Sequence, residues 1–408
     1  MRLPILSLIA LLHATAALAE TQPLQILVEP HAADPTKGTA SLAFRAKQNL
    51  TLLQPRRQQS NSEAPPLLVT CDGIEKPVVG HETPLSCRQL QWTLTFHNTQ
   101  TAPYALANQQ NLYSPTGWWS LTEWDDIPRF KDISEIAVCG KLHGKEAKAT
   151  CHPLPTMNEP PLILTWGNPT RTLTTGQTIL TLFKDDPTGA LKAENLPALQ
   201  QQLEYLQELL ASERKAPETI DLVWAAIDEK LGQTAGAAGK QAFLANFAIT
   251  DGATTENSRA KLHWVSAHEL FHLLATQPYP LWMSESLAQY YGYKSLEKAG
   301  LKAETPMEQW QGFKEHFPHA ETGLYEAHTK VTRENNPSYY PLFYVKGATF
   351  WQAVDQELQK AGSSLDLILP QLNSAEPKGP ALSATTLELL KASLSEQVIT
   401  SLHQQYLH

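Results

Sequence analysis

The five-residue stretch His-Glu-Leu-Phe-His at residues 268–272 constrains the fold of this chain more than any other feature. Residues four apart on an α-helix lie on one face about one turn apart, so His268 and His272 can reach the same metal ion, with Glu269 beside them. Apolar residues recur around this stretch at helical spacing, namely Leu262, Val265, Leu270, Leu273 and Leu274. The pattern predicts a helix that packs into a core and presents two metal ligands.

A third ligand is needed, because catalytic zinc usually takes three protein ligands and leaves its fourth position open. Glu285 follows His272 after twelve intervening residues, in the segment Trp-Met-Ser-Glu-Ser-Leu-Ala-Gln-Tyr at 282–290. We therefore expect a zinc (Zn²⁺) site formed by His268, His272 and Glu285. His263 is an alternative ligand, but it lies about 140° around the helix from His268, which favours a packing or surface role. Without a metal, the helix would carry two hydrogen-bonded histidines and a surface glutamate.

The residues after the second histidine distinguish between classes of zinc peptidase. Metzincins require glycine and histidine at the positions of Ala275 and Pro278, so that class is excluded. A glutamate ligand in the setting Trp-x-x-Glu-x-x-Ala-x-Tyr instead resembles the gluzincins, and within them the M1 and M61 aminopeptidase families. The sequence Tyr-Val-Lys-Gly-Ala at 344–348 is similar to the Tyr-x-Lys-Gly-Ala element of those families. The resemblance implies a zinc metallopeptidase with a thermolysin-like, mainly helical catalytic domain.

The catalytic residues can be assigned from chemistry and from the resemblance together. Glu269 can accept a proton from the attacking water and later deliver it to the leaving amine. The resemblance implies that the Tyr344 hydroxyl stabilises the oxyanion of the tetrahedral intermediate, and a neutral phenol can donate without adding charge. Tyr344 could instead be a half-buried structural residue. Four other tyrosines are rivals for the role: Tyr290, Tyr291, Tyr339 and Tyr340.

The chain departs from the M1 pattern in two places. Eighteen residues usually separate the second histidine from the glutamate ligand, so the shorter connector at 273–284 is expected to form a tighter turn between helices. M1 enzymes also carry a Gly-x-Met-Glu-Asn strand whose glutamate binds the substrate amine. The resemblance implies that Asn246 matches the asparagine and Ala245 replaces the glutamate, on a substrate-binding edge strand at 242–249. The amine anchor would then be missing, unless Glu256 substitutes for it.

The N-terminal residues predict export from the cytoplasm. Residues 1–19 contain Arg2, an apolar run from Ile5 to Leu12, and Ala-Leu-Ala before Glu20, the pattern of a cleaved secretory signal peptide. No later stretch is apolar over the eighteen residues needed to span a bilayer. We therefore expect a periplasmic or secreted protein without a membrane span.

Four cysteines fit an oxidising compartment. Cys71 lies close to Cys87 in the sequence, and Cys139 lies close to Cys151, so pairing within each couple is the simplest of three possible connectivities. A cysteine metal site is the alternative, although the spacings lack Cys-x-x-Cys clustering.

The distribution of patterns along the chain predicts an α+β protein. Residues 20–190 contain short β-rich runs separated by Pro, Gly and Asn clusters, which is typical of an antiparallel β-sandwich-like domain. Residues 191–408 contain a helical repeat of leucines, two strands and several helices, and are expected to form the gluzincin zinc peptidase domain. The strands predicted before residue 190 are Leu24–Val28, Leu90–Phe96, Leu162–Trp166 and Thr178–Phe183, and those after it are Ile220–Ala225 and Ala242–Ile249.

Composition narrows the function further. The formal net charge of −9 and the absence of a basic patch, a phosphate loop or a Gly-x-Ser-x-Gly motif argue against a nucleic-acid partner and a serine hydrolase. We expect a zinc metallopeptidase acting on a peptide or protein substrate. Two alternatives stay open: a catalytically weak or inactive binding protein with this fold, and a zinc hydrolase of a non-peptide amide.

Overall fold

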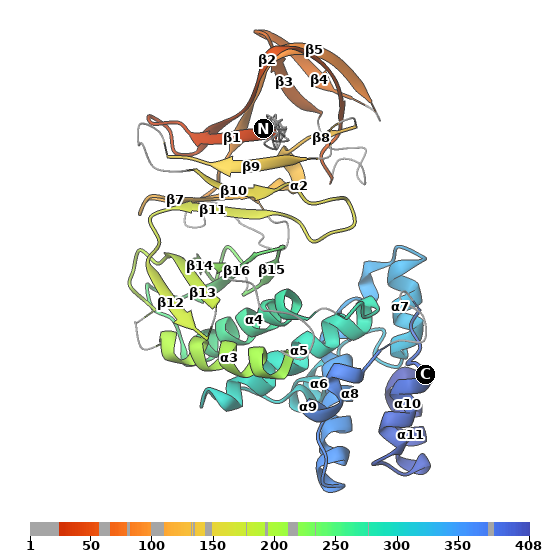
Figure 1. Cartoon of the computed structure of the whole chain (residues 1–408). Helices are drawn as coiled ribbons and strands as arrows, with labels where there is room; N and C mark the ends of the chain where they lie inside the picture. Colours follow the sequence, from red (N-terminus) through yellow and green to blue (C-terminus); the bar gives the residue numbers. More distant parts are fainter. Residues whose placement is uncertain are drawn as a thin grey trace, which may run out of the picture.

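The computed structural model describes residues 24–56, 66–79, 82–98, 110–131, 133, 135–142, 149–176, 178–191, 195–210, 219–232, 234–275, 277–373 and 379–408. Strands gather in the N-terminal part and helices in the C-terminal part, with a smaller sheet between them (Figure 1). The expected order, a β region followed by a mainly helical region, is confirmed. The predicted signal peptide lies outside the described residues.

The N-terminal part is built on an eight-stranded sheet in which all neighbours pair antiparallel except β1 and β9. Its long strands alternate buried and exposed side chains, because one face packs on a core and the other faces solvent. The strands are β1 (Leu24–Pro30), β2 (Lys37–Leu53), β3 (Leu67–Cys71), β4 (Ile74–Val78), β5 (Thr83–Thr95), β8 (Arg129–Phe130), β9 (Ile136–Gly140) and β10 (Thr150–Pro153).

Two disulfides fasten this sheet, and both have the predicted pairing. Cys71 at the end of β3 is bonded to Cys87 in β5, and Cys139 in β9 is bonded to Cys151 in β10. Each disulfide closes a short loop. In the chain-entropy model this restricts the unfolded chain and stabilises the folded protein by roughly 3 kcal/mol.

A three-stranded sheet joins the two parts of the molecule. It consists of β6 (Leu112–Ser114), β7 (Trp118–Thr122) and β11 (Ile163–Gly167), and the short helix α2 (Glu123–Asp126) follows β7. Trp118 is buried and its ring lies edge-on to Phe183 at 6.2 Å, so the core of this sheet continues into the next one.

The third sheet has the order β12-β13-β14-β16-β15. Its strands are β12 (Arg171–Thr175), β13 (Thr178–Asp185), β14 (Thr219–Asp228), β15 (Gly236–Ala238) and β16 (Ala242–Ile249). The three central strands run parallel and the two edge strands antiparallel. β13 was expected to belong with the N-terminal strands, but it pairs with β14 across a helical crossover. The alternation of apolar and polar residues along a strand does not reveal which strand it pairs with. The predicted boundary at residue 190 therefore separates β13 from the sheet to which it belongs.

Helices cover this sheet and build the rest of the C-terminal part (Figure 1). They are α3 (Asn195–Leu210), α4 (Glu256–Leu274), α5 (Leu281–Lys298), α6 (Pro306–Lys314), α7 (Leu324–Thr332), α8 (Pro341–Lys360), α9 (Leu365–Ile368), α10 (Ala384–Lys391) and α11 (Glu396–Leu402), with 3₁₀ turns at Pro337–Tyr339 and Leu369–Gln371 and a π-helical end at His403–Leu407. No helix in the described ranges is both long and apolar enough to cross a membrane.

The helices α4, α5 and α8 are packed closely enough to need glycine at their contacts. Thr255 is the N-cap of α4, and its side chain accepts a hydrogen bond from the Ser258 N–H. A Cβ on Gly292 of α5 would lie 2.7 Å from the Trp264 ring of α4, and a Cβ on Gly347 of α8 would lie 2.5 Å from the Cβ of Ser286 on α5. These contacts fix α5 between its two neighbours.

Candidate metal centre

Helices α4 and α5 bring three potential metal ligands together. His268 and His272 extend from α4, and Glu285 extends from the start of α5. Glu285 Oε2 lies 3.3 Å from His268 Nε2 and 3.5 Å from His272 Nε2. The two Nε2 atoms are 3.1 Å apart. Among the residues that the structure describes, this is the one group of three or more His, Cys, Asp or Glu side chains whose ligand atoms converge.

The triangle of donor atoms has the size that zinc requires. Ligands placed about 2.0–2.1 Å from a tetrahedral ion are separated from one another by about 3.3 Å. The observed separations of 3.1, 3.3 and 3.5 Å lie on both sides of that value. Two imidazoles and one carboxylate are also a donor set that zinc accepts in catalytic sites. The predicted residues therefore fit a zinc ion.

The outer nitrogen of each imidazole has a partner that orients the ring. His268 Nδ1 lies 3.0 Å from Gln289 Oε1, and His272 Nδ1 lies 3.3 Å from Ser284 Oγ. In a neutral ring, a proton held at Nδ1 by such a partner leaves Nε2 able to bind a metal ion. Neither partner was identified from the sequence. The signal that could have found Gln289 is its position one helical turn after Glu285.

Glu269 lies beside the three ligand atoms and is almost fully buried. The backbone N–H of Ala238 donates a hydrogen bond to its carboxylate. A Cβ on Gly236 would lie 2.7 Å from Glu269 Oε1, so only glycine allows β15 to approach this closely. Burial raises the pKa of Glu269, although the two histidines oppose the shift. A raised pKa suits a carboxylate that accepts and returns a proton near neutral pH.

The electrostatics of the ligand group favour a charged Glu285. Burial pushes the pKa of Glu285 upward, but hydrogen bonds from His268 and His272 outweigh it and hold that pKa well below its usual value. Burial lowers the pKa of His272, and its interactions with Glu285 reverse the shift. Glu285 is therefore the carboxylate ion that metal coordination requires.

Two of the five candidate tyrosines lie at the site. The Tyr344 ring is 5.7 Å from the His268 ring, and the Tyr340 ring is 5.4 Å from the Tyr344 ring. The Tyr340 hydroxyl donates to Glu285 Oε1 at 3.0 Å. Burial raises the pKa of both tyrosines, so both hydroxyls stay protonated and can donate. The other three tyrosines make their contacts away from the cavity. Tyr290 donates a hydrogen bond to Asp355, Tyr291 stacks on Phe271, and Tyr339 stacks on His319.

The structure does not bring Ala245 and Asn246 to the site. β16 is an inner strand between β14 and β15, so its backbone is already paired on both sides. Ala245 is fully buried in the core, and the Asn246 side chain accepts a hydrogen bond from the Ala235 N–H at 2.6 Å. The edge strand beside the metal ligands is β15. The sequence did not predict this strand. Residues 236–239 are all Gly or Ala, and the segment has neither the length nor the β-branched residues that indicate a strand.

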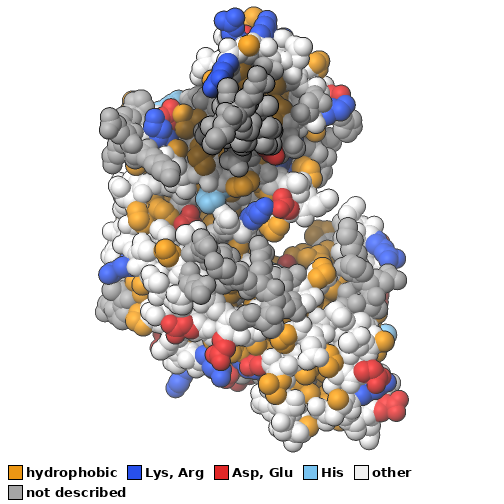
Figure 2. All heavy atoms as spheres, in the orientation of Figure 1, with side chains coloured by type: hydrophobic (Ala, Val, Ile, Leu, Met, Phe, Trp, Pro, Cys, Tyr) orange, Lys and Arg blue, Asp and Glu red, His pale blue; other side chains and the backbone are white. Residues whose placement is uncertain are grey.

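A cavity of about 720 Å³ surrounds the candidate ligands. Its wall includes the edge strand β15, the α4–α5 connector and one residue of the N-terminal part, Pro160. Figure 2 shows that the surface is hollowed between the N-terminal strands and the C-terminal helices. The full lining is Pro160, Gly236, Ala237, Ala238, Gly239, His268, Glu269, His272, Ala275, Gln277, Tyr279, Ser284, Glu285, Tyr340 and Tyr344.

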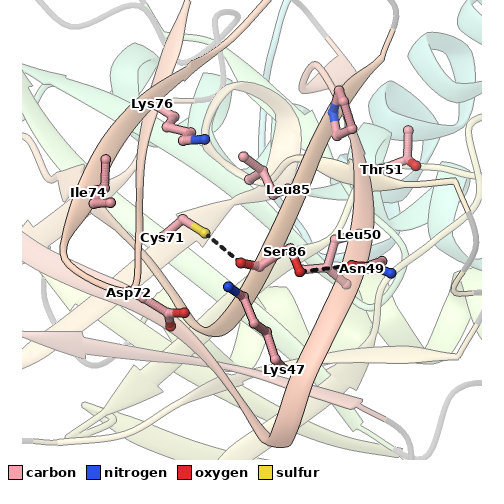
Figure 3. A pocket seen from close by; sticks show the side chains of 11 residues that line it. Lys47, Asn49, Leu50, Thr51, Cys71, Asp72, Ile74, Lys76, Leu85 and Ser86 are labelled. Atoms are coloured by element: carbon pink, nitrogen blue, oxygen red, sulfur yellow. Dashed lines mark hydrogen bonds between the residues drawn. The ribbon is translucent and has the colours of Figure 1, made fainter.

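A second cavity of about 610 Å³ lies on the N-terminal sheet. Figure 3 shows Lys47 and Lys76 at its rim, with Asp72 nearby and the Ser86 hydroxyl bonded to Asn49. Its described lining contains one carboxylate and no histidine, so it offers no comparable group of metal ligands. The cavity beside α4 is therefore the candidate catalytic site.

Comparison with known proteins shows the fold. No known family model matches the chain, and no curated protein matches its sequence. Among solved structures, it is similar to an aminopeptidase N family protein from Idiomarina loihiensis, with a TM-score of 0.62 and 12% identity over 94% of this chain and 73% of that one. An M1 zinc metallopeptidase from Deinococcus radiodurans gives a TM-score of 0.48 and 15% identity, covering 94% of each chain. The first match confirms the expected resemblance to M1 proteins at the level of the fold.

Proposed function

We propose that this protein is a zinc-dependent metallopeptidase that hydrolyses peptide bonds. The observation that carries the proposal is the triangle of His268, His272 and Glu285 donor atoms, whose sides of 3.1 to 3.5 Å match a tetrahedral zinc site. The fold shared with the aminopeptidase N family protein supports it. When bound there, zinc would polarise the scissile carbonyl and make the attacking water more acidic.

Glu269 is the general base of this proposal. Its carboxylate lines the cavity next to both histidines, and its raised pKa allows it to hold the proton that it takes from the attacking water. It then delivers that proton to the nitrogen of the leaving amine. The Ala238 N–H keeps the carboxylate in place during both transfers.

Tyr344 is the proposed oxyanion donor, and Tyr340 has a different role. Tyr340 already donates its hydroxyl to Glu285, so it orients a ligand. Tyr344 lines the same cavity and lies against the His268 ring, where a protonated phenol can donate to an oxyanion.

The substrate backbone would pair with β15. Among the described strands it pairs only with β16, and its residues Gly236 to Ala238 line the cavity. An extended peptide can add to such an edge through main-chain hydrogen bonds. This replaces the strand at 242–249 as the proposed substrate-binding element.

A strict requirement for a free substrate amine is not part of the proposal. Among the described residues that line the cavity, the only carboxylates are Glu269 and Glu285, and both belong to the proposed metal and base group. Glu256 is exposed in the first turn of α4 and does not line the cavity. Residues 1–19 support a periplasmic or secreted location, as do the two disulfides.

Metal analysis combined with a peptide library tests the function. We expect one zinc per chain, and turnover that a chelator abolishes and added zinc restores. Zinc binding without turnover of any peptide would favour the inactive binding protein, and turnover restricted to non-peptide amides would favour the other hydrolase. A purified, zinc-supplemented protein that retains no zinc would overturn the proposal.

A further inference from the structure

A loop from the N-terminal part forms one wall of the catalytic cavity. Residues 154–162 connect β10 of the large sheet to β11 of the small sheet, and Pro160 within them lines the cavity. Pro160 is the one described lining residue that lies before the third sheet in the sequence. The position of this loop therefore determines part of the shape of the cavity.

Two buried arginines hold the loop from behind. Arg56, which follows β2, donates to the carbonyl oxygens of Glu159 at 2.7 Å and Thr156 at 2.5 Å. Arg129, in β8, donates to the carbonyl oxygen of Pro155. Both arginines are 7% exposed. The loop is thus anchored at Pro155, Thr156 and Glu159 by two arginines that lie more than twenty positions away in the chain.

One glutamate neutralises only part of this charge. Glu123 is completely buried, with Oε1 3.0 Å from Arg56 Nε and Oε2 2.5 Å from Arg129 Nη2. Two guanidinium groups share one carboxylate, and the loop carbonyls accept three further hydrogen bonds from them. A buried cation left without acceptors is strongly unfavourable. The loop and the arginines therefore stabilise each other's position.

The other side of the loop holds the end of the edge strand. The Lys240 ammonium lies 2.8 Å from Glu159 Oε1, and the Lys240 backbone N–H donates to the Pro161 carbonyl at 2.9 Å. A Cβ on Gly239 would lie 2.6 Å from that same carbonyl oxygen. The turn between β15 and β16 is therefore seated directly on the loop.

We propose that Arg56 and Arg129 are positioning residues for ligand binding in the catalytic cavity. Through the loop they fix Pro160 in the cavity wall, and through Glu159 and Lys240 they hold the end of β15, the strand proposed to pair with substrate. The N-terminal sheet thereby sets the affinity of the cavity without touching the metal ligands. The inference rests on the proposed function in taking a peptide as the ligand, β15 as the strand that pairs with it, and zinc as the metal that the probe binds.

Three variants test whether the arginines, the loop at 154–162 and the end of β15 hold one another in place. Arg56→Gln removes two loop contacts and keeps the Arg129–Glu123 pair. Glu159→Gln and Lys240→Gln break the partly exposed ion pair, with little risk to folding. The double variant Glu159→Lys with Lys240→Glu restores the pair in reverse. Arg171→Gln, at an exposed position in β12, is the matched control for loss of an arginine.

Two readouts are needed, one of which does not require turnover. Hydrogen–deuterium exchange of residues 155–161 and 236–241 should accelerate in both segments in Arg56→Gln and in Lys240→Gln. The Kd of a tripeptide hydroxamate, measured by calorimetry on zinc-loaded protein, should rise about tenfold. The zinc content and the kcat of any hydrolysed peptide should stay within about twofold of the wild type. The reversed pair should recover wild-type exchange and affinity, and Arg171→Gln should not differ from the wild type.

A merely structural role gives a different result. Arg56→Gln would then lower the melting temperature and the folded fraction. The folded molecules would keep the wild-type Kd for the hydroxamate and the wild-type KM for any hydrolysed peptide. That outcome, or unchanged exchange at 236–241 in all three variants, would overturn the inference. Failure of the wild type to hydrolyse peptides or bind the hydroxamate would overturn the proposed function instead, and the exchange data would still decide the coupling.

Discussion

Tyr340 donates its hydroxyl to Glu285 Oε1, while Oε2 of the same carboxylate faces the two histidines. One oxygen is thus held by α8 and the other is directed at the metal position. This relationship gives the two tyrosines of the site separate functions. Tyr340 contacts the candidate ligand Glu285, and Tyr344, whose hydroxyl is hydrogen-bonded to Tyr340, lines the cavity as the proposed oxyanion donor.

Phenylalanine variants should separate these functions. Tyr340→Phe should weaken zinc binding about 10- to 100-fold, because partners of metal ligands typically contribute that much to affinity. Tyr344→Phe should keep its zinc and lose roughly 10²-fold or more in kcat, as expected on removal of an oxyanion donor. Zinc affinity by competition with a chelator and steady-state kinetics on the same preparations measure both effects. The reverse pattern would exchange the two assignments.

Variants of the motif itself should separate binding from chemistry. His272→Ala removes one of three ligands and should not retain stoichiometric zinc. Glu269→Gln should retain zinc and lose most turnover, since an amide cannot accept the proton of the attacking water. Metal content and kcat are measured together. Stoichiometric zinc in His272→Ala would exclude this histidine as a ligand, and a wild-type kcat in Glu269→Gln would exclude that residue as the base.

The contact between α5 and α8 next to Glu285 should tolerate no added methyl group. Gly347→Ala would place a Cβ 2.5 Å from Ser286 Cβ, so the helices must separate. We expect a loss of about 1 to 3 kcal/mol in the free energy of unfolding, together with weaker zinc binding. Gly312→Ala in α6 is the matched control. Nothing lies within 4 Å of its Cβ, and alanine in a helix should be neutral or slightly stabilising. Equal stability of the two variants would contradict the close packing.

The local motifs identified the residues of the candidate metal centre because helical periodicity fixes which residues share a face. His268 and His272 needed only one helix, and Glu285 needed only the next one. Strand β16 was predicted with its observed bounds, Ala242–Ile249, since its apolar run ends at turn residues. Its place in the sheet was not predicted, because an inner and an edge strand differ in their neighbours and not in their own sequence. β15 is three residues long and adopts its position through pairing, so tertiary contacts alone define it.

His263 makes the stability of the folded protein depend on pH. Its Nδ1 bonds to Gln202 Oε1 at 2.9 Å on the side of α4 away from the site, and burial lowers its pKa to about 4. The unfolded chain binds this proton below about pH 6.5, and the folded chain does so only near pH 4. Stability should therefore fall as the pH drops from about 6.5 to 4, by about 3 kcal/mol. Urea unfolding at pH 7 and pH 4.5 should show a smaller difference for His263→Gln than for the wild type. An identical difference would mean that His263 titrates alike in both states.

The substrate amine provides the last prediction. Neither carboxylate among the described lining residues is available to pair with an ammonium, because Glu285 faces the histidines and Glu269 is the proposed base. Desolvating an ammonium without a partner costs several kcal/mol, so the site should gain little from a free N-terminus. We expect weak activity on single amino-acid anilides and comparable kcat/KM values for matched free and N-acetylated peptides. A preference above about a hundredfold for the free amine, equivalent to roughly 2.7 kcal/mol, would reveal an anchor.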